Sequence, residues 1–352
     1  MATGKPAIVP AHAAPTHNRD MGPPPPGTPA SIDAIAINPE IHEAFSVYNG
    51  EAERLKRLYE RLGRVSVLSI GASSTYAAYR GLWGVGPFFT ALDLLAVVLG
   101  ALGILLDIWI RVRDLKLRWL VNRFAADRVR SLKFQLYALA AQVRSRRELD
   151  KAARAASLAR LGALAEEVKF PVGALNTFHG STALNLAPPA PASDAHPTTP
   201  DPELLRAAVA DYRVRRVRYQ HAFAEQMSRD IADRRRGYDS WSDASFVLGA
   251  LLLVISIALR GWPGFAPLAP YFDATGLAFF VMTAVANVLS SGAAHVASNS
   301  RYQQYARDLS RLLDVEPDTP EAFISYIERM ELLALRELDD FWRDMWISSY
   351  RA

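Results

Sequence analysis

Two aspartates interrupt an apolar run that is otherwise long enough to cross a membrane. The run from residue 87 to 110, PFFTALDLLAVVLGALGILLDIWI, contains Asp93 and Asp107. A charged side chain in a bilayer is costly unless it is paired, hydrated or functional. Fourteen residues separate the two acids, which puts them on nearly the same helix face, about 20 Å apart along the axis. The chemistry on offer is ion pairing or a polar path through a membrane.

Three interpretations of these acids remain open. In the first, Asp107 pairs with Arg111 one turn later at the cytoplasmic boundary, and Asp93 lies in water near the outer boundary. In the second, this helix face and Asn287 in the second half of the chain line a polar pathway between packed helices. In the third, the acids make structural hydrogen bonds between helices.

Other site chemistry has little support in the sequence. The chain has no cysteine, so thiolate nucleophiles, disulfides and cysteine-ligated zinc are excluded. Its seven histidines do not pair with each other or with a carboxylate at metal-ligand spacing. There is no Gly-rich phosphate loop, no G-x-S-x-G elbow and no H-E-x-x-H pair. We therefore predict no catalytic residue, no metal site and no cofactor, and expect a protein that is not an enzyme.

Four apolar runs must hold these side chains in place. The two longer ones meet the roughly 20 residues that a membrane helix needs, and small residues in SVLSIGASS (66–74) and GALG (100–103) favour close helix packing. The pattern predicts an all-α integral membrane protein with four transmembrane helices, arranged as two hairpins with long cytoplasmic helical extensions. The predicted spans are residues 65–83, 87–110, 244–260 and 274–297.

Proline-rich segments divide the chain. MGPPPPGTPASIDA belongs to a predicted disordered tail over residues 1–37, and LAPPAPASDAHPTTPDP lies in a predicted linker. Asn38 and Pro39 together are typical of a helix start. The predicted organisation is a tail (1–37), the first hairpin with flanking cytoplasmic helices (38–184), the linker (185–203), and the second hairpin with flanking and C-terminal helices (204–352).

Basic residues gather on one side of the predicted spans. The short loops on the other side carry one basic residue each, Arg80 and Arg260. The positive-inside rule then predicts a multi-pass membrane protein with both termini cytoplasmic. The basic block DYRVRRVRYQ (211–220) is likewise attributed to topology and anionic lipid rather than nucleic acid, which is not an expected partner. The residues assigned to topology and anionic lipid are Arg111, Arg113, Arg234, Arg235 and Arg236.

The two hairpins resemble copies of one another. An offset of 180 residues places RGLWGVGP (80–87) on RGWPGFAP (260–267). The same offset aligns Asp93 with Asp273 and Asp107 with Asn287. A duplication of this kind implies a pseudo-two-fold axis along the membrane normal.

The helix after the second run carries a resemblance to a known family. The stretch LVNRFAADRVRSLKFQLYALA (120–140) is similar to the R-x-x-A-E-x-L-R-x-E-x-F helix that follows the hairpin in the bacterial SLATT family of two-transmembrane domains. The resemblance covers about residues 50–140, with Asp127 for the family's first glutamate, Val129 for its leucine and Leu132 for its second acid. The matching positions are Arg123, Ala126, Asp127, Val129, Arg130 and Phe134.

This resemblance implies a role in antiviral defence. SLATT-type domains are proposed to form or open membrane pores when a sensor protein or a nucleotide signal reports infection. Here it implies an effector of the bacterial inner (plasma) membrane whose cytoplasmic helices receive the signal from a separate sensor protein or nucleotide. The small residues of the apolar runs in turn favour a homo-oligomer in the lipid bilayer. Two alternatives stay open: an ion channel or transporter unrelated to defence, and a membrane-anchored helical scaffold.

Overall fold

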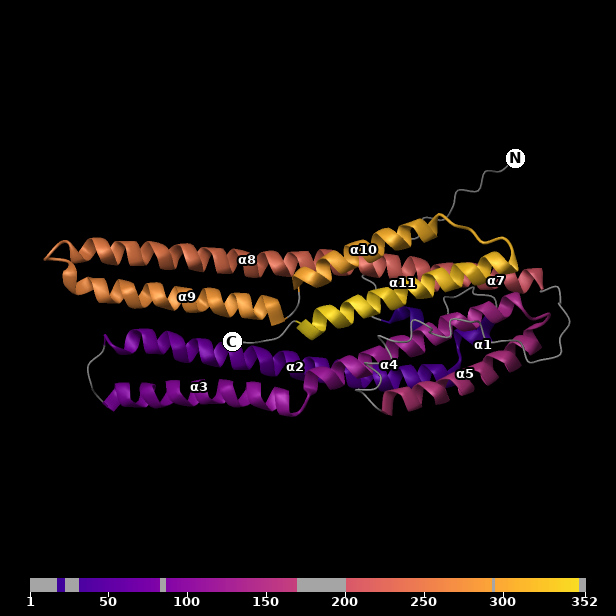
Figure 1. The fold of residues 1–352 in the computed structure, drawn as a ribbon, viewed down its shortest axis with the longest axis horizontal. Helices are drawn as coiled ribbons and strands as arrows, with labels where there is room; N and C mark the ends of the chain where they lie inside the picture. Colours follow the sequence, from indigo (N-terminus) through magenta and orange to yellow (C-terminus); the bar gives the residue numbers. More distant parts are fainter. Residues whose placement is uncertain (1–17, 23–31, 83–86, 170–200, 293–294, 348–352) are drawn as a thin grey trace.

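The protein is an elongated helical assembly. The computed structural model describes residues 18–22, 32–82, 87–169, 201–292 and 295–347, and these contain helices and no strand. The all-α prediction is confirmed. At one end of the molecule four long helical segments lie side by side, and at the other end shorter helices form a bundle with the continuations of two of them (Figure 1).

Each half of the chain contributes one long antiparallel helix pair and shorter bundle helices. The first half contains η1 (Arg19–Met21), α1 (Asp33–Ala36), α2 (Pro39–Arg80), α3 (Pro87–Val112), α4 (Leu115–Gln135), η3 (Leu136–Ala141) and α5 (Arg146–Lys169). The second contains α7 (Pro202–Tyr212), η4 (Arg213–Arg218), α8 (Tyr219–Arg260), η5 (Ala266–Leu268), α9 (Ala269–Gly292), α10 (His295–Leu313) and α11 (Pro320–Ile347).

The internal repeat has a structural counterpart. Helices α2 and α8 are both 42 residues long, and both of their ends are displaced by 180 residues. Each packs antiparallel against the next long helix, α2 against α3 and α8 against α9, and α2 also packs against α9 (Figure 1). The four helices therefore lie in the order α8, α9, α2, α3.

Helix starts follow their sequence signals. The side chain of Asn38 accepts a hydrogen bond from the backbone N–H of Ile41 at 3.1 Å, and Pro39 occupies the first turn of α2, as predicted. Asp201 accepts from the N–H of Glu203 at 2.9 Å, and Pro202 opens α7. These caps fix where each half of the chain enters its helical part.

The end of the molecule opposite the bundle is apolar on its outside. Three helical stretches are long and apolar enough to cross a membrane: Ala91–Val112, Pro202–Arg260 and Ala266–Gly292. Large apolar side chains there are exposed, among them Leu94, Val97, Leu105, Val254 and Ile257. Soluble proteins rarely expose a continuous apolar surface of this kind, so the molecule has the surface of a membrane protein.

Two boundaries of the predicted spans differ. The predicted span 65–83 begins inside α2 and runs past the end of that helix at Arg80. This part of α2 is not among the three stretches, so the four-span arrangement stays a prediction. Within the predicted span 274–297, α9 extends to Gly292 and α10 begins at His295, and residues 293–294 lie outside the described residues.

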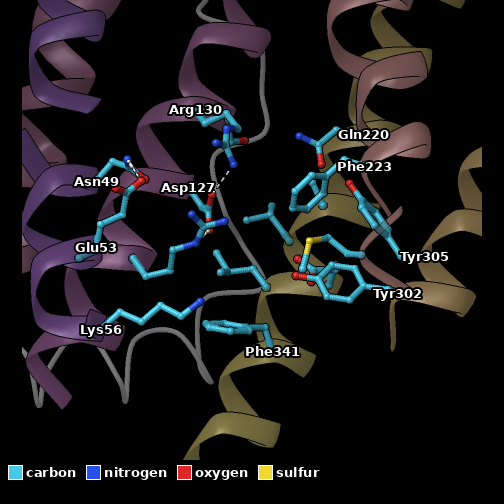
Figure 2. Close-up of a pocket in the computed structure, with 18 of the residues that line it drawn as sticks. Asn49, Glu53, Lys56, Asp127, Arg130, Gln220, Phe223, Tyr302, Tyr305 and Phe341 are labelled. Atoms are coloured by element: carbon cyan, nitrogen blue, oxygen red, sulfur yellow. Dashed lines mark hydrogen bonds and ion pairs between the residues drawn. The ribbon is translucent and has the colours of Figure 1, made fainter. Parts of the chain in front are cut away.

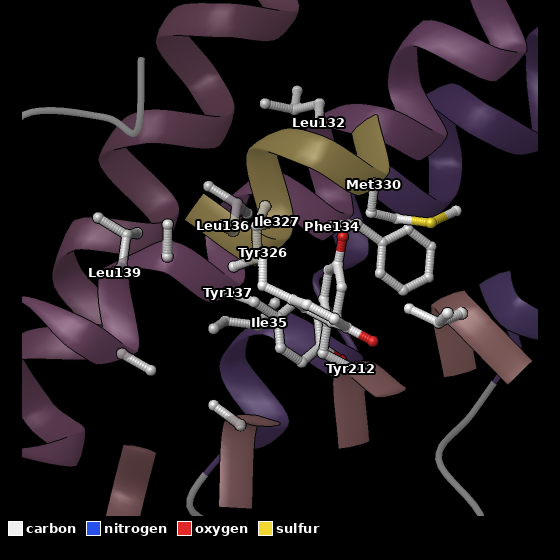
Figure 3. Packing of buried hydrophobic residues seen from close by; sticks show 14 of the residues in the cluster. Ile35, Leu132, Phe134, Leu136, Tyr137, Leu139, Tyr212, Tyr326, Ile327 and Met330 are labelled. Atoms are coloured by element: carbon white, nitrogen blue, oxygen red, sulfur yellow. The ribbon is translucent and has the colours of Figure 1, made fainter. Parts of the chain in front are cut away.

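The main hydrophobic core lies in the bundle. Aromatic rings from four elements meet in it: Phe134 of α4, Tyr137 of η3, Tyr212 of α7, and Phe323 and Tyr326 of α11 (Figure 3). The Tyr137 and Tyr212 rings pack edge to face with centroids 5.5 Å apart. This core joins both halves of the chain into one body.

The predicted disordered tail over residues 1–37 is wrong for two segments. Residues 18–22 form a turn with η1, and residues 32–37 include α1. Ile32 and Ile35 are fully buried, and Asp20 is 2% exposed. Burial of these side chains against α4 and α5 supplies the stability that a free tail lacks. The rest of the tail, and most of the predicted linker over residues 185–203, lie outside the described residues; its last residues, 201–203, open α7.

Candidate functional site

Each predicted membrane acid is paired within its own helix pair. Asp107 accepts from Arg111 at 2.5 Å, one turn later on α3, as the first interpretation expects. Asp93 of α3 forms an ion pair with Arg80 of α2 and accepts from the Tyr76 hydroxyl of α2 at 2.8 Å. Asp93 therefore makes an interhelical contact rather than lying in water alone.

The second helix pair repeats this contact. Arg260 of α8 pairs with Asp273 of α9, the counterpart of the Arg80–Asp93 pair at an offset of 180 residues. Asn287 of α9 accepts from Ser242 of α8 at 3.0 Å, again within one pair. Because α2 lies between α3 and α9, the structure does not bring Asn287 to Asp107 (Figure 1).

The predicted basic residues differ in their surroundings. Arg113 is exposed, and Arg111 pairs with Asp107. On α8, Arg235 pairs with Asp239 at 3.1 Å and Arg236 pairs with Asp233. Arg234 has no hydrogen bond or ion pair with any residue that the structure describes, and it lines a cavity instead. Arg234 is therefore set apart from its two neighbours.

A charged cavity of about 480 Å³ lies between the bundle helices, at the level where α2 and α8 leave the bundle. Lys56 points into it from α2, and Phe223 and Tyr302 face it from α8 and α10 (Figure 2). Arg123 and Asp127 of α4 also line it and pair at 2.8 Å. We call this space the charged cavity.

Lys56 is the most unusual base of this site. Its amine lies 3.9 Å from Glu60 and 5.9 Å from the centre of the Trp119 ring. Helices enclose it, yet 52% of its side chain stays accessible because it faces the cavities. Desolvation lowers the pKa of Lys56; Glu60 opposes this shift, and Arg123 and Arg234 add to it. Two arginines, Arg123 and Arg234, therefore lie close enough to act on the Lys56 amine across the cavity.

A second cavity, of about 760 Å³, continues from the first toward the apolar end, and we call it the boundary cavity. Lys56, Glu60, Trp119, Tyr302 and Phe341 line both. It extends between α2 and α8 along α9, where its lining includes Leu68, Ala72, Val281, Val285 and Leu289. The two spaces together connect the bundle interior to the membrane-like part.

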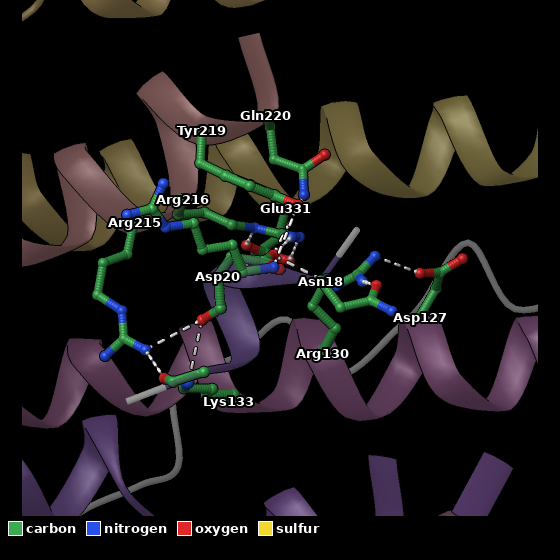
Figure 4. A network of polar contacts seen from close by, with 12 residues as sticks. Asn18, Asp20, Asp127, Arg130, Lys133, Arg215, Arg216, Tyr219, Gln220 and Glu331 are labelled. Atoms are coloured by element: carbon green, nitrogen blue, oxygen red, sulfur yellow. Dashed lines mark hydrogen bonds and ion pairs between the residues drawn. The ribbon is translucent and has the colours of Figure 1, made fainter. Parts of the chain in front are cut away.

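A buried charge network lies beside the charged cavity. The Asp20 carboxylate accepts from Gln220 at 3.2 Å and lies 3.3 Å from Arg130 and 3.9 Å from Arg216 (Figure 4). Arg216 also donates two hydrogen bonds to Glu331, at 2.8 and 2.9 Å. Buried charges persist only when they are paired in this way.

The basic block DYRVRRVRYQ supplies part of this network, so the prediction that it contacts lipid is wrong for two of its arginines. Arg215 and Arg216 are 4% and 2% exposed, in the π-helical turn η4. Lys133 of α4 donates to the backbone carbonyl of Asp20 at 3.1 Å, and burial lowers its pKa to about 7. The sequence offered no signal for these contacts because the partners lie far apart along the chain.

The side chains that line the two cavities suit the binding of an anion better than the catalysis of a reaction. Among the described residues, no three His, Asp or Glu side chains gather in a way that would hold a metal ion. The bases lining the two cavities outnumber the acids: Lys56, Arg57, Arg64, Arg123, Arg130, Arg216, Arg234 and Arg301 against Glu53, Glu60, Asp127 and Glu337. Comparison of the chain with protein-family models, curated proteins and solved structures finds no match.

Proposed function

We propose that this protein is a bacterial membrane effector of the SLATT type. Its two helix pairs would cross the inner membrane as two hairpins, with both termini cytoplasmic, and several copies would form a pore. A separate sensor protein or a nucleotide signal would act on the bundle. The observation that carries the proposal is the continuity of α2 and α8, each a single helix of 42 residues that lines the cavities and continues into the apolar end. A shift at the cavities would therefore move both helices at membrane depth.

The fourth span in this proposal is the second half of α2. Its hydropathy is reduced by hydroxyl residues, of which Ser66 and Ser69 are 3% and 7% exposed. Ser66 donates to the carbonyl of Gly103 at 2.8 Å, so its polar group is satisfied away from lipid. Since α3 and α9 cover α2 on two sides, α2 needs less apolar surface than the other three spans.

Several chains are needed for a pore of this kind. Asp93, Asp107 and Asp273 each pair with an arginine of the same helix pair. A conducting path would therefore form between copies, where the partly exposed Asp107 (28%) meets a neighbour. The same pairing favours the second candidate, a membrane-anchored helical scaffold in which these pairs only stabilise the helices.

Membrane potential separates the two candidates. A voltage-sensitive dye is followed while the full chain is induced to rising levels, because mass action favours assembly. We expect depolarisation before growth slows, and a weaker effect for Asp107→Leu combined with Asn287→Leu. Asp239→Leu is the matched control, because Asp239 also pairs with an arginine four residues away but lies outside the predicted spans.

All variants are compared at equal amounts in the membrane fraction. Depolarisation that is lost only in the double variant supports a pore with Asp107 in its path. A constant potential at every expression level, with the chain in the membrane, contradicts the pore and favours the scaffold.

A further inference from the structure

The boundary cavity changes from charged to apolar along one helix. Its α2 wall presents Lys56, Glu60 and Arg64, and then Leu68, Ala72 and Thr75, a spacing of three or four residues that follows one helix face. The wall from the last base, Arg64, to Thr75 is about 17 Å long at a rise of about 1.5 Å per residue, and its apolar part from Leu68 to Thr75 is about 11 Å long. One leaflet of the hydrocarbon core is about 15 Å deep. A group bound at Arg64 would therefore lie about one leaflet's depth from the far end of this wall.

The opposite wall has the same polarity. Arg234 lies on α8 just before Tyr238 and Trp241, and all three line the cavity. Tyrosine and tryptophan collect where the membrane meets water, with an apolar ring on one side and a polar group on the other. The α9 floor contributes Val285 and Leu289. Both walls thus place their bases at the level of the membrane surface and their apolar side chains at membrane depth.

The charged end has more bases than it can neutralise. Among the described residues that line the boundary cavity, Glu60 is the one acid, and it is shared by Arg64 at 3.3 Å and Lys56 at 3.9 Å. Arg234 pairs with no residue that the structure describes. The fourth lining base, Arg301, is already satisfied by Glu337 at 3.1 Å and Asp344 at 2.6 Å. Three bases with one carboxylate leave room for a bound anion.

We propose that the boundary cavity binds an anionic phospholipid of the cytoplasmic leaflet, with its phosphate held by Lys56, Arg64 and Arg234 and one acyl chain lying between α2 and α8 against α9. This rests on the membrane location in the proposed function, but not on pore formation.

The apolar part of the cavity argues for a lipid over a free anion. A soluble phosphate would use only the basic end and leave the space beside Ala72, Val281 and Leu289 without an apolar occupant. An acyl chain would fill it and gain from contact with those side chains. The bound lipid would also bridge α2 and α8, the two helices that continue into the bundle.

Lipid retention by the purified full chain tests this proposal. The protein is extracted into a neutral detergent, mixed with phosphatidylglycerol or phosphatidylcholine of equal chain length, and weighed intact by native mass spectrometry. We expect one tightly held phosphatidylglycerol per chain and little phosphatidylcholine. Lys56→Gln with Arg234→Gln should weaken this binding about thirty-fold, since juxtamembrane bases contribute independently.

The matched control is Arg235→Gln with Arg236→Gln, which removes the same charge from the same surface but leaves the cavity intact. It should retain the lipid as the unchanged chain does. Ala72→Phe should block the acyl chain while leaving the bases in place. If it fails to fold, which its melting curve will show, Leu289→Gln tests the same end by placing a polar group there.

Three results would overturn the proposal. One is equal retention of the two lipids. Another is equal loss of lipid in the cavity variant and its control. The third is full displacement of the lipid by inorganic phosphate, together with normal lipid binding by Ala72→Phe and Leu289→Gln. That result would make the cavity a site for free anions. None of these measurements depends on conductance. Failure of the lipid proposal is therefore distinguishable from failure of the pore proposal.

Discussion

Asp20 illustrates how a single side chain can hold the bundle together. Its carboxylate is 2% exposed and lies within 4 Å of Arg130, Arg216 and Gln220, which come from α4, η4 and α8. Removal of one partner of a buried ion pair leaves the other charge uncompensated. The short segment around η1 therefore ties the two halves of the chain to each other.

We predict that Asp20→Asn lowers the free energy of unfolding by about 2 kcal/mol, because Arg130 and Arg216 each lose one of two carboxylate partners and keep Asp127 and Glu331. The control is Asp33→Asn, since Asp33 lies in the next short helix but is 37% exposed and 3.7 Å from Arg146. Its loss should cost less than about 0.5 kcal/mol. Thermal melts in one detergent measure both. Equal melting temperatures for the two variants would contradict the structural role of Asp20.

At this scale the sequence predicts local contacts and misses distant ones. The Asp107–Arg111 pair could be predicted, because residues four apart on a helix are neighbours. The contacts of Asp20 could not be predicted, because its partners lie more than 100 residues away and the sequence around it is typical of a Pro-rich disordered tail. Arg234 could be recognised as a basic residue at a membrane boundary, but its separation from Arg235 and Arg236 depends on which helix face meets the cavity.

Helix packing at membrane depth depends on small residues. A side chain at Gly103 of α3 would place its Cβ 2.6 Å from Ile70 and 2.8 Å from the Ser66 carbonyl of α2. In the second pair, a Cβ at Gly249 or at Gly276 would lie 3.0 Å from the other glycine's carbonyl. Backbones approach closely at both places, as expected for membrane helices that associate without a hydrophobic driving force between them.

We predict that Gly103→Ala destabilises the protein by about 1–3 kcal/mol, since the added methyl overpacks the contact between α2 and α3. Gly50→Ala is the matched control: Gly50 lies inside α2, and nothing comes within 4 Å of its added Cβ. It should be neutral or gain up to about 1 kcal/mol from helix propensity. Denaturation in a single detergent compares them, and a stabilised Gly103→Ala would show that the approach is not tight.

The elements themselves were largely predictable, but their continuity was not. Apolar runs and caps locate α3, α9 and the start of α2, and GALG indicates the close packing of α3. Hydropathy changes sharply within α2 and α8, so the sequence divides each of these 42-residue helices into a polar and an apolar element. The structure joins them because no residue breaks the helix where the surroundings change.

For the whole molecule, the shape follows from the distribution of charge and apolar surface. Polar helices of both halves share one aromatic core, while the apolar segments lie together at the opposite end (Figure 1). The repeated ion pairs Arg80–Asp93 and Arg260–Asp273 lie where α2 and α8 end. In the proposed topology, these pairs lie at the outward-facing surface of the inner membrane and the bundle lies in the cytoplasm.

The most direct test of the proposed topology is the side of the membrane from which each of four single-cysteine variants is labelled. The labelling is specific to the introduced residue because the chain has no cysteine of its own. Leu82 lies just after the end of α2, Gly264 lies in the predicted outer loop between α8 and α9, and Val47 and Val315 are exposed positions of the bundle. Each cysteine variant is treated with a membrane-impermeant maleimide in intact cells and again after permeabilisation. Four spans predict that Leu82→Cys and Gly264→Cys label in intact cells and that the other two label only after permeabilisation. Labelling of Gly264→Cys alone, with Leu82→Cys protected, would show that α2 does not cross the membrane and would contradict the proposed topology.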